Sequence, residues 1–199
     1  MKQNKKIFLW LSVLVLFASA GAVPQDDPQT GVADPGPAVA NKEPGPAEAD
    51  AHLDWFIGQW QTKVKAWTEP NKPPSESKGS MEARKILKYF IYETWHGALS
   101  AQPFEGHRTE SYDQISKKYV SCWIDNMSNG IIIHATGTCA GDKCVLSGEI
   151  IDPTTGKKGV LSTVTTWLDK DNFLLEELEK IGTGPEMKVL EVRAKRKKM

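Results

Sequence analysis

Short runs of alternating apolar and polar residues follow one another from about residue 59 to the end of the chain. Alternation with a period of two is typical of strands that bury one face. Stretches rich in Gly, Pro, Asn, Asp and Ser, such as EPNKPPSES, DPTTGKK and GTGPE, separate the runs and favour turns. The pattern predicts strands at residues 59–67, 79–87, 89–97, 104–112, 118–127, 131–139, 144–151, 159–168, 173–181 and 187–195.

About ten short strands without long helical patterns predict an all-β fold. A meander of this kind has exposed edges unless it closes, so we expect a single antiparallel up-and-down β-barrel. Two segments, 79–87 and 173–181, also contain many helix-favouring residues, but we predict them as strands. Residues 49–58 predict a short N-terminal helical turn that Gly58 ends.

The first predicted strand opens with the sequence GQW, directly after the helical turn. This opening resembles the G-x-W motif of the calycin proteins, which include the lipocalins and fatty-acid-binding proteins. In those proteins the tryptophan closes one barrel end and stacks with a basic residue from near the last strand. The resemblance implies a barrel-closing structural role for Gly58 and Trp60, with Arg193 as the candidate basic residue.

Three longer segments, LDWFIGQWQTKVKAW, QPFEGHRTESYDQISKKYVSCWIDNMSNGI and GEIIDPTTGKK, carry a closer resemblance. They are similar to an uncharacterised bacterial family, the domain-of-unknown-function family numbered 1579. The resemblance covers nearly the whole predicted domain. It implies a calycin-like, lipocalin-like barrel, often exported, without an established activity.

The chain begins with the pattern of a secretory signal peptide, predicted at residues 1–22. Lys2, Lys5 and Lys6 precede an apolar run at residues 7–17, and small residues in an A-x-A pattern follow. A run of about 11 residues is short against the roughly 20 that span a bilayer, so cleavage is favoured over an uncleaved anchor helix. The sequence therefore predicts export, to the periplasm or to the medium.

Residues 23–50 hold six of the twelve prolines and almost no large apolar side chains. Such a segment cannot offset its ordering entropy by burial, and we expect a disordered linker rich in Pro, Ala and acidic residues. The predicted barrel domain then covers residues 51–197. No segment after the signal peptide is long and apolar enough to predict an integral membrane helix.

Charge gives no reason to expect nucleic acid as a partner. Removal of the signal peptide takes away three lysines and leaves 22 basic and 25 acidic residues, a net charge of −3. The closing RAKRKKM is basic, but a short charged tail is usually a solvated chain end.

Three cysteines follow the predicted signal peptide, in a context that permits disulfides. Cys139 and Cys144 flank the turn-like AGDK, and we expect a disulfide across this hairpin. Cys122 is left unpaired and is predicted as a small buried hydrophobic side chain.

One predicted hairpin supplies a candidate ligand site. A two-residue turn at residues 129–130 would place Asp125 opposite His134, with Trp123 and Tyr119 on the same face. If this face points inward, it forms a mixed aromatic and polar floor of the kind that binds small ligands. The alternative is that the aliphatic face points inward and the Asp–His pair is exposed.

A second candidate lies in the segment IYETWHG. An inward Glu93 beside Trp95 would be a buried acid in need of a partner, and Arg108 could serve. The more common arrangement is an exposed glutamate. Trp95 and Arg108 complete the predicted set of ligand-binding residues.

The sequence contains no complete catalytic signature, and it predicts neither a cofactor nor a metal site. The four histidines show no metal-ligand spacing, and the hairpin disulfide explains Cys139 and Cys144 better than a zinc set with His134. The S-x-x-K match at residues 75–78 lies in a proline-rich loop without the other serine-enzyme motifs. A haem ligand at His134, as in the nitrobindin barrels, ranks low.

These patterns predict an exported barrel that binds a small apolar or amphipathic molecule. The alternative is a structural or interaction module whose packed interior holds no ligand. A haem-binding or enzymatic barrel is the third possibility.

Overall fold

The structure is a computed structural model, and it describes residues 51–69, 71–99, 101–128, 130–152 and 155–198. The signal peptide and linker predicted at residues 1–50 lie outside the described residues. Residues 51–54 form the short helical turn that the sequence predicts before the first strand.

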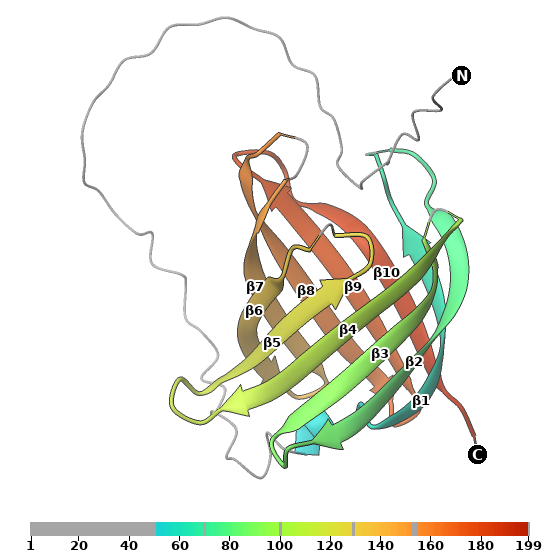
Figure 1. The fold of residues 1–199 in the computed structure, drawn as a ribbon, viewed down its shortest axis with the longest axis vertical. Coiled ribbons are helices and arrows are strands. Elements are labelled where there is room, and N and C mark those ends of the chain that lie inside the picture. Colours follow the sequence, from blue (N-terminus) through green and yellow to red (C-terminus); the bar gives the residue numbers. More distant parts are fainter. Residues whose placement is uncertain (1–50, 70, 100, 129, 153–154, 199) are drawn as a thin grey trace, which may run out of the picture.

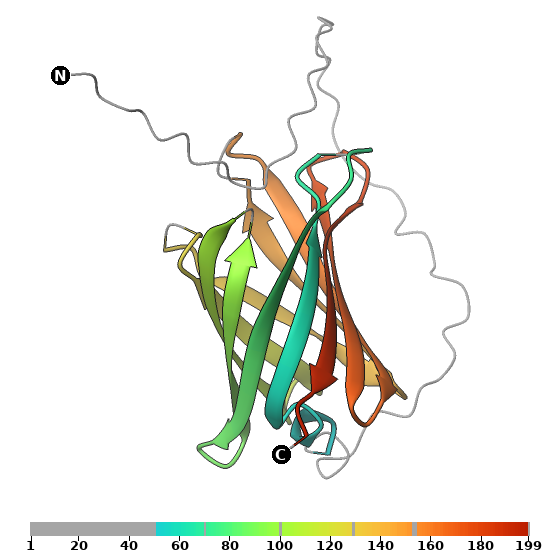
Figure 2. The ribbon, with the colours of Figure 1, turned by 90° about the vertical axis from the view of Figure 1, so that its right-hand side faces the viewer.

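Ten antiparallel strands close into one barrel, with β1 between β2 and β10 and each other strand beside its neighbours in the chain (Figures 1 and 2). The strands are β1 Gly58–Ala66, β2 Ser75–Ile86, β3 Phe90–Leu99, β4 Gln102–Asp113, β5 Lys118–Asp125, β6 Ile133–Ala140, β7 Lys143–Ile151, β8 Lys158–Asp169, β9 Asn172–Ile181 and β10 Met187–Arg196. The predicted fold class and its ten strands are confirmed.

The two segments with helix-favouring residues are strands, as predicted. β2 begins at Ser75, before the expected start at residue 79. Its residues 75–83 pair with β1, and its residues 80–86 pair with β3. β9 pairs with both β8 and β10. Hydrogen bonding to two neighbours outweighs the local helix propensity in both segments.

Up-and-down connections place alternate turns at the same end of the barrel. Residues 51–57 are called the lead-in, and the barrel end that holds them is called the lead-in end. It is the lower end in Figure 1. It also carries the last described residues and the turns that follow β2, β4, β6 and β8. The opposite end is called the far end.

Aromatic side chains fill the barrel at the lead-in end. Trp60 is fully buried, and its indole Nε1 donates a hydrogen bond of 2.8 Å to the carbonyl of Phe56. The ring of Trp60 lies 4.9 Å from Phe173 and 5.8 Å from Trp167, centroid to centroid. These rings pack the helical lead-in onto the strands and close this end.

The basic residue that stacks on Trp60 is Arg196, and the expectation of Arg193 is wrong. Arg193 is exposed and pairs with Lys63 of β1, because it lies on the outward face of β10. Arg196 lies opposite Trp60 in the ladder, with its guanidinium carbon 4.1 Å from the ring centroid. Its Nη2 donates to the carbonyl of Trp55 at 2.8 Å.

Gly58 leaves room for this contact. Its φ of 131° is one that residues with side chains rarely adopt, and an added Cβ would lie 2.8 Å from Nη1 of Arg196. The structure thus places Gly58 and Trp60 together at the closed end, with Arg196 as their partner.

We expect Arg196→Met to lower the free energy of unfolding by about 2 kcal/mol, because it removes a cation–π contact and hydrogen bonds to the lead-in. Arg193→Met is the matched control on the same strand and should change it by less than about 0.5 kcal/mol. Urea denaturation followed by tryptophan fluorescence measures both. Equal losses for the two variants would contradict this assignment.

Candidate functional site

The hairpin between β5 and β6 has a different register from the predicted one. Cys122 lies opposite His134, and Trp123 lies opposite Ile133. The predicted pairing of Asp125 with His134 is therefore wrong, and His134 is exposed on the outside of the barrel. A register shift by an odd number of residues moves a side chain to the other face.

The side chain of Asp125 explains the shift. Its Oδ1 accepts hydrogen bonds from the backbone N–H of Met127 at 2.7 Å and of Ser128 at 2.6 Å. These bonds turn the chain directly after β5. The expected turn is still present further on, since the N–H of Ile131 donates to the carbonyl of Ser128 at 2.9 Å, but it does not set the strand register.

Four of the predicted site residues, Tyr119, Trp123, Trp95 and Arg108, do face the barrel interior. Glu93, Arg108 and Trp123 lie side by side on three neighbouring strands. The partnership expected for Glu93 is confirmed, because Nη2 of Arg108 donates to its Oε1 at 2.6 Å. Trp95 Nε1 donates to the other oxygen of Glu93 at 2.9 Å.

Arg108 lies between two carboxylates inside the barrel. Glu93 is fully buried and Glu110 is 3% exposed, and Nη1 of Arg108 lies 3.3 Å from Oε2 of Glu110. The guanidinium also lies 5.2 Å from the ring centroid of Phe56 in the lead-in. Glu93, Arg108 and Glu110 are called the charged cluster. It therefore lies next to the aromatic rings that close the lead-in end.

The interior holds more acidic than basic side chains. Burial raises the pKa of Glu110 to about 7, although the Arg108 charge opposes this. Burial likewise raises the pKa of Glu177 to about 7, with Arg108 again opposing and Asp125 adding to the rise. Burial lowers the pKa of Arg108, but Glu93 and Glu110 outweigh it and raise the pKa. The interior thus favours positive charge.

Two atoms of the charged cluster have no hydrogen-bond partner among the described residues. They are Nε of Arg108 and Oε2 of Glu110, and both side chains are more than nine-tenths buried. An unpaired polar atom that has lost its water carries a desolvation cost of about 1–3 kcal/mol. The cluster therefore offers one donor, Nε of Arg108, and one acceptor, Oε2 of Glu110, to a molecule inside the barrel.

Inward-facing side chains on the other side of the barrel are only half-buried. Thr163 and Glu177 lie opposite each other on β8 and β9, on the same face as the buried Thr165 and Leu175. Since these side chains point into the barrel, their exposed surface faces its interior. The packing of the lead-in end does not continue through this level.

Aromatic rings line the interior toward the far end. Trp123 lies edge-on to Trp95 at 6.4 Å and stacks with Phe104 at 6.1 Å, centroid to centroid. Gly106 makes room for this ring, because an added Cβ would lie 2.4 Å from Cζ2 of Trp123. Trp123 Nε1 donates to Asp125 at 2.8 Å, which fixes the ring.

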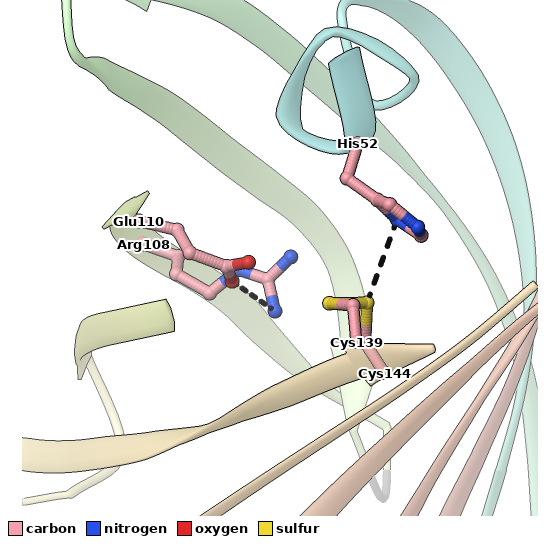
Figure 3. The surroundings of a disulfide bond; sticks show 5 residues. All are labelled: His52, Arg108, Glu110, Cys139 and Cys144. Carbon is pink, nitrogen blue, oxygen red and sulfur yellow. Dashed lines mark hydrogen bonds and ion pairs between the residues drawn. A yellow bond between two sulfur atoms is a disulfide. The ribbon is translucent and has the colours of Figure 1, made fainter. Parts of the chain in front are cut away.

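The predicted disulfide between Cys139 and Cys144 is present and joins facing residues of β6 and β7. His52 of the lead-in lies against it, with Nδ1 3.8 Å from Sγ of Cys144 (Figure 3). One ligand atom from each of these three residues lies within 4.8 Å of the others, so they could hold a metal ion only if the disulfide were reduced. Cys122 is half-buried and free.

The sequence could have indicated two inward acidic residues, Glu110 of the charged cluster and Glu177 of β9. Glu110 follows Arg108 by two residues, and Glu177 follows Leu175 by two, so strand alternation places both on inward faces. The role of His52 could not be found in this way, because it depends on how the lead-in folds over the barrel end.

A hollow of about 190 Å³ lies on the outside of the barrel. It is lined by Glu105, His107, Ile124, Asp125 and Asn126. His107 is held there by Tyr92, whose hydroxyl lies 2.7 Å from Nδ1, and by Glu105 at 3.0 Å from Nε2. These polar contacts satisfy both ring nitrogens, which leaves the interior cluster as the better candidate site.

We expect the stability of the protein to fall as pH rises through about 7. The raised pKa of Glu110 means that the folded chain holds this proton more tightly than the unfolded chain. Its contribution to stability is therefore complete below the unfolded pKa of 4.5 and is lost as pH rises through about 7. Glu110→Gln should raise the free energy of unfolding at about pH 8 by on the order of 2 kcal/mol.

Urea denaturation between about pH 5 and about pH 8 measures this effect. Glu186→Gln, in an exposed turn, is the control and should leave the pH dependence unchanged. An identical pH dependence for the wild type and Glu110→Gln would contradict the prediction.

Comparison with known proteins supports the fold. The crystal structure of Rv2717c from M. tuberculosis matches at 17% identity and a TM-score of 0.57, over 75% of this chain and 98% of that chain. A barrel titled EF1p2_mFAP2b bound to DFHBI matches at 13% identity over 77% of this chain and 100% of that chain. Its TM-score is 0.42.

No curated protein matches the chain significantly. The sequence model of one family, described as a protein of unknown function, matches residues 45–196, which include the whole barrel. The chain therefore belongs to the DUF1579 family, as the resemblance of its sequence segments implies.

Proposed function

We propose that this protein binds a small amphipathic molecule inside the barrel, between the charged cluster and the aromatic rings toward the far end. The observation that carries the proposal is a pair of buried polar atoms without hydrogen-bond partners among the described residues: Nε of Arg108, and Oε2 of Glu110, which has only its ion pair with Arg108 at 3.3 Å. A polar group of the ligand would bond to these atoms. Its apolar part would lie against Trp95 and Trp123.

The uneven packing of the interior supports binding over a solid barrel. The lead-in end is filled by the rings of Trp60, Trp167 and Phe173, which are nearly or fully buried. At the level of Thr163 and Glu177 the inward side chains are half-buried. A module that served only as a packed scaffold would have little reason to hold several carboxylates around one guanidinium there.

Binding of haem through His134 gains no support. This side chain is exposed and lies outside the barrel, opposite Cys122. The candidate ligand-binding set is accordingly Trp95, Arg108, Tyr119 and Trp123, to which we add Glu110. Asp125 acts through Trp123, whose ring it holds.

We also propose that the protein is exported and that its signal peptide is removed. The basic, apolar and small-residue pattern of residues 1–22 supports this proposal. The disulfide between Cys139 and Cys144 agrees with an oxidising compartment. Intact mass measurement of the protein from its own host tests the proposal, since a retained N-terminus would contradict it.

The binding proposal is tested by filling the interior. Thr163→Phe places a ring at an inward, half-buried position of β8 and should weaken uptake of the fluorescent apolar amine N-phenyl-1-naphthylamine by about tenfold or more. Val145→Phe, at an outward and exposed position of neighbouring β7, is the control and should bind as the wild type does. Circular dichroism shows whether each variant is folded.

Native mass spectrometry of the protein from its own host gives the second readout. A small molecule that co-purifies with the wild type, and is lost from Thr163→Phe, supports the proposal. A clean apo mass together with no uptake of the probe would contradict it. Equal uptake of the probe by the wild type and Thr163→Phe would mean that the probe binds outside the barrel interior, and this would contradict the proposal.

A further inference from the structure

Large apolar side chains project from the turns at the lead-in end. Ile115, in the turn between β4 and β5, is 95% exposed, and Leu87, between β2 and β3, is 81% exposed. Trp55 of the lead-in, Tyr89 and Leu168 are also exposed at this end. The hairpins of Leu87 and Ile115 are neighbours in the barrel and lie at its lower end in Figure 1. Exposed apolar side chains that gather at one end of a molecule can mark an interaction surface.

The same end is strongly basic. Its residues, taken as 51–57, 85–91, 113–118, 140–143, 168–172 and 195–198, contain ten Lys or Arg and five Asp, a net charge of +5. Several of these acids are already engaged. Asp54 pairs with Lys85 at 2.9 Å, and Asp171 pairs with Arg196 at 3.3 Å.

The lysines surround the apolar tips. Lys88 follows Leu87 directly, and Lys117 and Lys118 follow Ile115 within three residues; all three lysines are exposed. The C-terminal Lys197 and Lys198 lie at this end as well (Figure 2). Each apolar tip therefore has at least one exposed lysine within three residues.

The backbone of the tip of Leu87 is strained. Leu87 has a φ of 46° and Lys88 a φ of 67°, in the left-handed region that glycine and asparagine occupy most easily. A residue of either kind would relieve this strain, yet a leucine and a lysine occupy the turn. Tight hairpin turns require this conformation, and Ala101 at the far end also adopts it with a φ of 64°.

The far end provides a comparison within the same molecule. It also carries exposed apolar side chains, Ile131, Ile132 and Ile151. Its described residues within 66–76, 98–105, 125–133, 150–158 and 180–188 hold five Lys and six Asp or Glu, a net charge of −1. Apolar exposure combines with positive charge at the lead-in end alone.

We propose that the lead-in end docks on the surface of an anionic lipid bilayer. Leu87 and Ile115 insert among the acyl chains near the headgroups, and the surrounding lysines contact lipid phosphates. Apolar insertion and electrostatic attraction act together, as in peripheral proteins that lie on a membrane. Within the described residues no helix is long and apolar enough to span a bilayer. The proposal does not depend on ligand binding inside the barrel.

Co-sedimentation with large unilamellar vesicles tests the proposal. The protein as purified from its host should bind vesicles of phosphatidylcholine with about one-third phosphatidylglycerol, and bind vesicles of phosphatidylcholine alone about tenfold or more weakly. Raising the salt from about 0.1 M to about 1 M should weaken the first interaction by about tenfold, because salt screens the lysines. Equal binding to both vesicles, or none to either, would overturn the proposal.

Paired variants locate the docking surface. Leu87→Ser with Ile115→Ser should weaken binding by about tenfold or more, and Lys88→Gln with Lys117→Gln by a similar factor, since each lysine contributes about fivefold. The control, Ile132→Ser with Ile151→Ser at the far end, should bind as the wild type does. Every variant carries the same N-terminal residues, so binding through that segment would be equal in all of them and would refute the proposal. Capture by an acidic protein without vesicle binding would also refute it.

Discussion

Closure of the ten-stranded sheet is the constraint on which the rest of the structure depends. Every strand is hydrogen-bonded on both sides, so each side chain is committed either to the interior or to the outer surface. This commitment brings Glu93, Arg108 and Glu110 into one enclosed space, although the same residue types on an open sheet could turn to water. It also lets Arg196, at the end of the chain, reach Trp60 at its first strand.

The sequence was enough to predict the ten strands, the helical turn and the disulfide, because each depends on local patterns. It was not enough to predict register. Ile131 bonds back to Ser128, but the side chain of Asp125 bonds to the N–H groups of Met127 and Ser128, and the pairing of β6 is shifted. For the same reason Arg193 was expected to stack on Trp60, although Arg196 does so. The two arginines lie on opposite faces of β10. Local turn preference and family resemblance do not contain these tertiary contacts.

The candidate site illustrates the same division. The alternation of inward and outward side chains was enough to predict that Arg108 could pair with Glu93, because β3 and β4 are consecutive in the chain. It did not connect Arg108 with Glu177, which lies on β9 and influences Arg108 from another part of the barrel. An electrostatic influence of this kind depends on how the closed barrel brings distant strands together, and no local sequence pattern records that arrangement.

Burial and charge together separate the barrel into regions with different physical properties. The aromatic rings that close the lead-in end account for stability there, because their close packing excludes water. At the level of Arg108, buried charged side chains take the place of part of the apolar packing. A structural role alone does not require such buried charges. Outside, the lead-in end adds basic turns and exposed apolar tips that do not contribute to the core. The buried carboxylates at the level of Arg108 and the exposed apolar turns of the lead-in end are therefore the two features on which the proposed interactions rest.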